Sequence, residues 1–386
     1  MSTTTSVIRN GYPPHTLTGG SQTTNITQHG IVACGIDTLV IGFCVSSYIA
    51  SEVDFSVLSE AKIQAGETKF KSRGCGVTWY GSDFSVQAKG SRGYEWIISN
   101  DDLSVCIAKS AQSGRVYPEI YVTFRSSYLW GVGYKMAYSR VRSWLNRWAV
   151  VVGEKVSRCD LTVDIDMSLP TIDIGVEIVG RARTKSDHFG RYCSGLRVTG
   201  YSIGTGDIAA RIYDKTLEVK VSQKEWFYDL WRSNGWNGDT PVTRFEFQLR
   251  REILKEYSVD SFSDLTERLA DIWRYCSVDW LSVRSPGRTK VRHRWETKDY
   301  WIVLQNLVDY FGSCRGMLRY KQKQPKIKHM ADMARGVLTT LFALHEQVYG
   351  PYAGRRDLRW EINSWSEDPA FLTAVDERKK QLAILN

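Results

Sequence analysis

The chain has 386 residues, of which 42% are hydrophobic, 12% aromatic and 24% charged, and its formal net charge is +9. This composition is typical of a globular protein, and the chain contains no run of 18 apolar residues, which excludes a membrane-spanning helix. The positive charge favours a polyanionic partner only weakly, because many basic proteins bind no nucleic acid.

The first 30 residues are rich in Ser, Thr, Gly and Pro, and we expect them to be flexible. They show no signal-peptide pattern, so we expect a cytoplasmic protein with no membrane partner. No two of the eight cysteines are close enough for a CxxC pair, which favours free thiols in a reducing compartment over disulfides or zinc ligands.

The remaining chain repeats one order of elements. A strand is expected at 35–43 and again at 158–166, and a second strand leading into a helix is expected at 119–149 and at 241–275. Short alternating strands separated by turn residues are expected at 75–81, 84–90, 95–100 and 103–109. We therefore predict an α+β fold of two related lobes, residues 31–150 and 151–283, each an antiparallel sheet with helices packed on one face.

Acidic residues distinguish the second lobe from the first. When the halves are aligned, Asp37 matches Asp160, whereas Ile41 stands where the second half has Asp164, and Thr123 stands where it has Glu246. Acids inside a sheet are costly unless they are paired or bound to metal. We therefore expect the second lobe to be catalytic and the first to bind DNA or support the fold.

The strand at 158–166 places Asp160 and Asp164 on one face. Carboxylates at this spacing suit a hard cation such as Mg²⁺ or Mn²⁺, and Glu246 completes the metal site if its strand is a neighbour. The alternative is a salt-bridged, solvent-exposed sheet face.

The stretch DIAARIYDKTLEVK (207–220) is expected to begin as a strand with Arg211 and Tyr213 on one face. We predict Tyr213 as a nucleophile, with Arg211 and Lys215 as cations that stabilise phosphate. Other schemes lack a signal, because the sequence has no His-x-His pair, HExxH, P-loop or GxSxG motif.

The last region, 284–386, is expected to be basic, aromatic and helical, with a helix at 330–350 that packs on the body. Basic side chains neutralise phosphates and aromatic rings stack on unpaired bases. The alternative is an ordinary solvated surface. The residues predicted to bind DNA are Arg288, Lys290, Arg292, Arg294, Trp295, Arg319, Lys321 and Lys323.

The order R-x-D-x-x-x-D, then GYSIGTGDIAARIYDKTLE, then TRFEFQLRR resembles the Rep_trans family of replication initiation factors, over roughly residues 150–310. That family includes rolling-circle plasmid initiators, relaxases of integrative conjugative elements and related phage proteins. The resemblance implies a metal-dependent nicking and joining enzyme whose tyrosine forms a 5′-phosphotyrosyl link at an origin hairpin.

The same resemblance implies that Asp160, Asp164 and Glu246 hold Mg²⁺ or Mn²⁺ and that Tyr213 attacks. Tyr201 and Tyr192 are the alternative nucleophiles. The implied partners are origin DNA in duplex, hairpin or single-stranded form, a host helicase and a second copy of the chain. Two rival functions stay open: a non-catalytic DNA-binding protein, and a metal-dependent nuclease that uses water.

Overall fold

The computed structural model describes residues 30–49, 54–67, 74–91, 93–111, 118–181, 189–194, 197–314, 327–350, 359–360, 362–364 and 367–384. The chain divides into two compact units, Met1–Tyr320 and Lys321–Asn386, and each is described by itself. The start of the C-terminal region, predicted at 284, lies inside the first unit. Apart from Gly30, the expected flexible segment lies outside the described residues.

The first lobe contains the strands that alternation predicted, together with helices that follow or connect them. These elements are β1 (Ile31–Tyr48), α1 (Ser56–Glu67), β2 (Cys75–Trp79), β3 (Ser82–Val86), β4 (Trp96–Ser99), β5 (Leu103–Ile107), β6 (Ile120–Phe124), α2 (Ser126–Val132) and α3 (Tyr134–Leu145).

The second lobe and the segment after it contain strands and more helices than the first lobe. They are β7 (Ala149–Asp166), α4 (Ile174–Glu177), β8 (Ile178–Gly180), β9 (Phe189–Ser194), β10 (Arg197–Ile203), β11 (Ile208–Asp214), α5 (Lys215–Ser222), α6 (Trp226–Ser233), β12 (Val242–Arg250), α7 (Arg251–Glu256), α8 (Phe262–Arg274), η3 (Tyr275–Trp280), β13 (Leu281–Val283), η4 (Arg292–Arg294), α9 (Asp299–Gln305) and η5 (Asn306–Tyr310).

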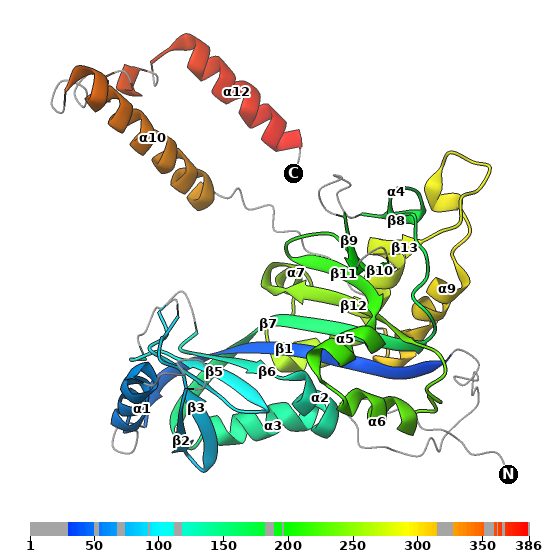
Figure 1. The fold of residues 1–386 in the computed structure, drawn as a ribbon. Coiled ribbons are helices and arrows are strands. Elements are labelled where there is room, and N and C mark those ends of the chain that lie inside the picture. The colour runs from blue at the N-terminus through cyan, green and yellow to red at the C-terminus, as the bar shows by residue number, and fades with distance from the viewer. Residues whose placement is uncertain are drawn as a thin grey trace. The chain divides into compact units, whose positions relative to one another are not determined.

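Strands of both lobes join in one antiparallel sheet, in the order β2-β3-β4-β5-β6-β1-β7-β12-β11-β10-β9 (Figure 1). The two long strands β1 and β7 pair along almost their whole length, from Ile31 opposite Ile165 to Tyr48 opposite Ala149. The predicted α+β class is therefore confirmed, and the two lobes share a single sheet through the β1–β7 pair.

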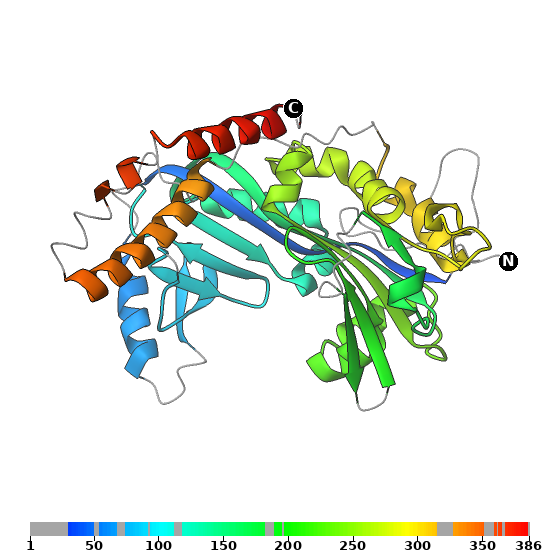
Figure 2. The ribbon, with the colours of Figure 1, turned by 90° about the horizontal axis from the view of Figure 1, so that it is seen from above.

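One face of the sheet is the main core. Residues such as Leu161, Val163 and Phe247 point into it and are buried against side chains of α1, α3, α7, α8 and α9. Figure 2 shows α7, α8 and α9, in light green to yellow, along one side of the second-lobe strands. Alternation then directs the intervening residues of β7 and β12 to the opposite face.

That opposite face is covered at one end by α5 and α6. Their apolar side chains form a second, smaller core with β1, α2 and the start of β12, and its buried members are Val32, Ala33, Trp130, Val219, Phe227, Leu230, Trp231, Trp236 and Val242. Helix α5 begins directly after β11 because Asp214 caps it, accepting a hydrogen bond from the Leu217 amide. Helices of the second lobe thus lie on both faces of its sheet.

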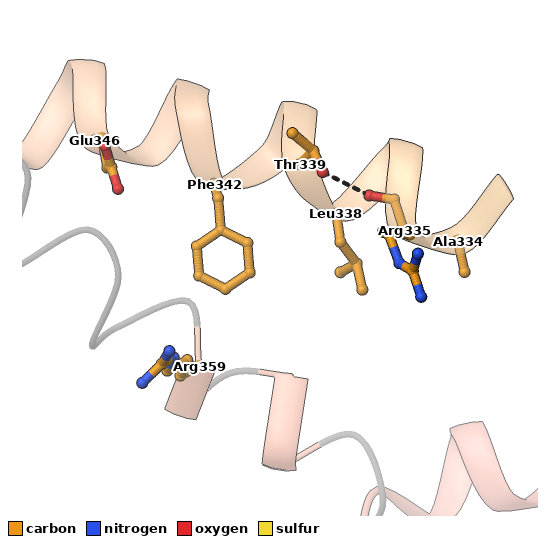
Figure 3. A pocket seen from close by; sticks show the side chains of 7 residues that line it. All are labelled: Ala334, Arg335, Leu338, Thr339, Phe342, Glu346 and Arg359. Carbon is orange, nitrogen blue, oxygen red and sulfur yellow. Dashed lines mark hydrogen bonds between the residues drawn. The ribbon is translucent and has the colours of Figure 1, made fainter. Parts of the chain in front are cut away.

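The second unit contains α10 (Ile327–Tyr349), which matches the helix predicted at 330–350, and α12 (Pro369–Ile384). An open pocket lies between α10 and the segment at Arg359 (Figure 3), and its lining is Ala334, Arg335, Leu338, Thr339, Phe342, Glu346 and Arg359. None of the predicted site residues belongs to this set.

None of the eight cysteines, all of which lie in the described ranges, forms a disulfide, as the spacing predicted. None of the helices within the described ranges is long and apolar enough to cross a lipid bilayer.

Candidate active site

Three neighbouring strands, β7, β12 and β11, bring the predicted catalytic residues of the second lobe to one surface. Arg244 pairs with Asp164, and Glu246 lies between Thr162 and Arg211 in the register. Directly opposite residues of antiparallel strands share a face. We call this side of the sheet, which also carries Asp160 and Tyr213, the polar face.

Tyr213 and Arg211 meet at one carboxylate on the polar face. The Tyr213 hydroxyl donates to Glu246 Oε2 at 3.1 Å, and Arg211 Nη1 lies 2.9 Å from Glu246 Oε1. Arg211 also donates through Nη2 to the side-chain oxygen of Gln248. Burial, followed by the negative charge of Glu246, holds the pKa of Tyr213 well above its usual value. The phenol is therefore protonated and hydrogen-bonded to a candidate proton acceptor.

Asp160 forms a second charged pair on this face. Arg158 grips it with Nε at 2.9 Å and Nη2 at 2.5 Å, and the aspartate side chain is only 2% exposed. Burial raises the pKa of Asp160 to about 6, because the charge of nearby Glu246 adds to desolvation while Arg158 only partly opposes it. The carboxylates of Asp160 and Glu246 therefore lie close enough for electrostatic repulsion between them.

Asp164 has a different environment from Asp160. Both of its oxygens bind the guanidinium of Arg244, at 2.5 and 2.8 Å, and the Trp231 indole donates to it at 3.0 Å. Arg244 also reaches Asp37 of the first lobe at 2.8 Å, and neither Arg244 nor Asp164 is exposed. This buried triad ties the two lobes together.

Asp37 is the third charged member of the triad. Burial alone would raise its pKa, but Arg244, Lys215 and the donors Ser126 and Trp130 hold the pKa well below its usual range. Two carboxylates therefore share the charge of Arg244 within a closed part of the sheet.

Lys215 stands at the first position of α5 and is buried, with 2% of its side chain exposed. Its ammonium group binds Glu218 and lies 4.4 Å from the centre of the Phe227 ring. Burial, with the nearby positive charge of Arg244, lowers the pKa of Lys215. Among the predicted cations, Arg211 is open to solvent, at 39% exposure, and Lys215 is enclosed.

The predicted metal ligands divide into two groups. Asp160 and Glu246, with the amide oxygen of Gln248, offer hard oxygen donors on adjacent strands, which suits Mg²⁺. Asp164 does not fit, because both of its oxygens bind the fully buried guanidinium of Arg244, whereas Arg158 and Arg211, the partners of Asp160 and Glu246, are 32% and 39% exposed. Within the described ranges, no group of three or more His, Cys, Asp or Glu side chains is arranged to hold a metal ion.

The two alternative tyrosines occupy opposite environments. Tyr201 is buried, and its hydroxyl accepts a hydrogen bond from the Ile172 amide. Tyr192 lies on the edge strand β9 and is 53% exposed. On the same strand pair, exposed Arg197 forms an ion pair with Asp214 at 2.8 Å.

The predicted DNA-binding segment, as far as it is described, forms a projection that includes η4 (Figure 1). The Arg284 guanidinium donates to the carbonyls of His293 and Trp295, and the Trp295 indole donates to the Thr289 carbonyl. Four basic residues of the prediction are exposed on it, namely Arg288, Lys290, Arg292 and Arg294. The others, Arg319, Lys321 and Lys323, lie outside the described residues.

Sequence reasoning missed the roles of Arg244, Asp37 and Arg197. The alternation of TRFEFQLR places Arg244 on the same face as Glu246, which is a usable signal. The partnership of Arg244 with Asp37 depends on pairing between residues 207 positions apart, which no local pattern shows.

Comparison with known proteins returns no matching family model and no matching curated protein. Among solved structures, the chain is similar to a rolling circle replication initiator protein from Geobacillus stearothermophilus. The two share 16% identity over 71% of this chain and 95% of that chain, with a TM-score of 0.40. A likeness at this level carries no functional argument, so the proposal below depends on the polar face.

Proposed function

We propose that this protein is a metal-dependent DNA-nicking and strand-transfer enzyme that acts at the origin of a mobile element. A tyrosine of the polar face attacks a phosphodiester and keeps the strand as a 5′-phosphotyrosyl link. The observation that carries the proposal is the Tyr213 hydroxyl donating to Glu246, with Arg211 bound to the same carboxylate.

Each part of that arrangement has a use in phosphoryl transfer. A carboxylate next to a phenol can accept its proton, and an exposed guanidinium can neutralise a phosphate oxygen. Arg211 meets the second requirement, since 39% of its side chain is exposed. Because the covalent link conserves the energy of the phosphodiester, the joining step needs no nucleotide cofactor.

Asp160 and Glu246 are the residues we propose to hold Mg²⁺ or Mn²⁺, with Gln248 beside them. When bound, the ion supplies Lewis-acid polarisation of the phosphoryl group. The arginines now paired with these carboxylates, Arg158 and Arg211, are both partly exposed, so a phosphate that approaches from solvent can reach their guanidinium groups.

Origin DNA is the proposed substrate and partner. The projection that carries Arg288, Lys290, Arg292 and Arg294 supplies exposed positive charge for the phosphate backbone. A host helicase and a second copy of the chain are further proposed partners.

The test is covalent capture of DNA on the full chain. Wild-type protein is incubated with Mn²⁺ and a supercoiled plasmid carrying the DNA around its own gene, and the products are separated on a denaturing protein gel. We expect an adduct that Glu246→Gln loses, because the amide cannot bind the ion as the carboxylate does. Glu252→Gln, an exposed change on α7, is the matched control and should keep the adduct.

A second candidate is a non-catalytic DNA-binding protein, and one observation favours it. Asp160, Asp164 and Glu246 are all ion-paired with arginine, as a purely structural sheet face requires. A non-catalytic protein would bind DNA in a salt-sensitive way without metal, and it would form no covalent adduct. Nicking without an adduct would instead indicate a water-using nuclease.

A further inference from the structure

Two tyrosines on the polar face are candidates for the attack on DNA. Tyr213 is half-buried and its hydroxyl is engaged by Glu246, whereas Tyr192 is 53% exposed. They lie in one row across the sheet, because Tyr192 pairs with Gly200 and Gly200 pairs with Tyr213. Side chains in such a row share a face.

Gly200 is the position that separates the two tyrosines. Neighbouring strands lie about 4.8 Å apart, which puts the two tyrosine Cα atoms about 10 Å from each other. A Cβ atom at position 200 would come within 2.7 Å of the Tyr213 Cβ and within 3.0 Å of the Ile212 carbonyl oxygen. Because position 200 is glycine, Tyr213 packs closely against β10. No side chain lies between Tyr213 and Tyr192 in this row.

Arg197 provides a cation on the same face as Tyr192. It pairs with Ser194, which is two residues along β9 from Tyr192. Its side chain is 65% exposed, and Nη2 lies 2.8 Å from Asp214 Oδ2. A guanidinium presents several donors in a plane and binds phosphate well. A DNA strand that approaches this edge of the sheet from solvent therefore meets a phenol and a cation together.

We propose that Tyr192 makes the covalent bond to DNA and that Arg197 binds the phosphate under attack. This inference rests on the proposed function. The Tyr192 oxygen bonds to phosphorus while the bond from phosphorus to the 3′ oxygen breaks. The phenolic proton passes to solvent water, the 3′ oxygen takes up a proton from water as it leaves, and the products are a 5′-phosphotyrosyl link and a 3′-hydroxyl. No oxidant, reductant or nucleotide is consumed.

The experiment maps the adduct in the full chain. Wild-type protein is incubated with Mn²⁺ and the supercoiled plasmid described above, treated with nuclease and protease, and analysed by mass spectrometry. We expect the nucleotide on the peptide that contains Tyr192 and no adduct in Tyr192→Phe. In Tyr213→Phe, the adduct should form more slowly but remain on Tyr192. Tyr349→Phe changes a tyrosine that is 60% exposed in the second unit and should match wild type.

Several outcomes would overturn this assignment. An adduct retained in Tyr192→Phe, or mapped to Tyr213, moves the nucleophile elsewhere while the proposed function stands. If Tyr192→Ala loses the adduct and Tyr192→Phe keeps it, the ring is a stacking surface and not a nucleophile. Wild-type protein that binds the plasmid but forms no adduct refutes the proposed function and this inference together. Arg197→Gln should slow adduct formation, and an unchanged rate would overturn the role of Arg197.

Discussion

Arg244 is the residue that organises the polar face. It is completely buried, yet it binds Asp164 through two bonds and Asp37 through a third. A buried charge of this kind is stable only while its partners compensate it. The triad therefore fixes the position of β12, and with it Glu246, which lies two residues further along the same strand and face.

Removal of Arg244 tests this structural role. Arg244→Met leaves the buried carboxylate of Asp164 and the largely buried one of Asp37 without their cation, so we expect the free energy of unfolding to fall by about 3 to 5 kcal/mol. Arg232→Met breaks an exposed pair, with Asp229 at 3.3 Å, and should cost less than about 1 kcal/mol. Urea unfolding of both variants measures the difference, and equal losses would contradict the account.

Asp160 gives the polar face a dependence on pH. Its pKa in the folded chain, about 6, lies above its ordinary value of 3.8. The folded state therefore keeps a proton that the unfolded chain releases, and the stability contributed by this residue is present below pH 4 and lost as the pH rises to 6. Asp160→Asn removes that loss.

Urea unfolding at pH 4 and pH 7.5 measures the effect of Asp160→Asn. Relative to wild type, the variant should gain about 2 to 3 kcal/mol between the two pH values. Asp229→Asn, whose side chain is 84% exposed, is the control and should show no such gain. A pH-independent difference for Asp160→Asn would show that its charge is not suppressed by burial. The same variant should lose the DNA adduct.

At the scale of residues, the sequence predicted which side chains lie on one face of a strand, but it did not predict which side chains they contact. Alternation placed Asp160, Asp164 and Glu246 on one face of their strands, which the register confirms. Their partners could not be predicted, because the contacts of Tyr213 and Arg244 depend on pairing between distant strands.

At the scale of elements, the sequence predicted where several strands lie but not how long they are. The strands predicted at 35–43 and 158–166 are each 18 residues long, as β1 and β7. Pairing through several bulges extends them into segments whose own alternation is irregular. The strands β9 and β10 and the aromatic helix α6 were not predicted, since a bulge interrupts the alternation of β10 and the eight residues of α6 make only about two helical turns.

The β10–β11 contact offers a test of the strand arrangement. Gly200→Ala puts a methyl group 2.7 Å from the Tyr213 Cβ, so we expect a loss of about 1 to 3 kcal/mol in the free energy of unfolding. Gly76→Ala is the matched control, because this β2 glycine has nothing within 4 Å of its added Cβ. Equal thermal stability of the two variants would contradict the close packing of β10 on β11.

At the scale of the whole molecule, strands of the two lobes form a continuous sheet. The sequence predicted two lobes, but their union depends on β1 pairing with β7, more than 100 residues apart. Asp37 crosses this junction to reach Arg244, so the first lobe contributes directly to the order of the polar face. The proposed chemistry therefore needs both lobes.

The central claim is that DNA becomes covalently attached to a tyrosine in a metal-dependent reaction. Wild-type protein is mixed with the plasmid carrying its own gene region, with Mn²⁺ or with EDTA, and the protein is examined on a denaturing gel. We expect a protein–DNA adduct with Mn²⁺ that EDTA abolishes, together with a free 3′-hydroxyl that a polymerase extends. Intact DNA binding without any adduct would contradict it.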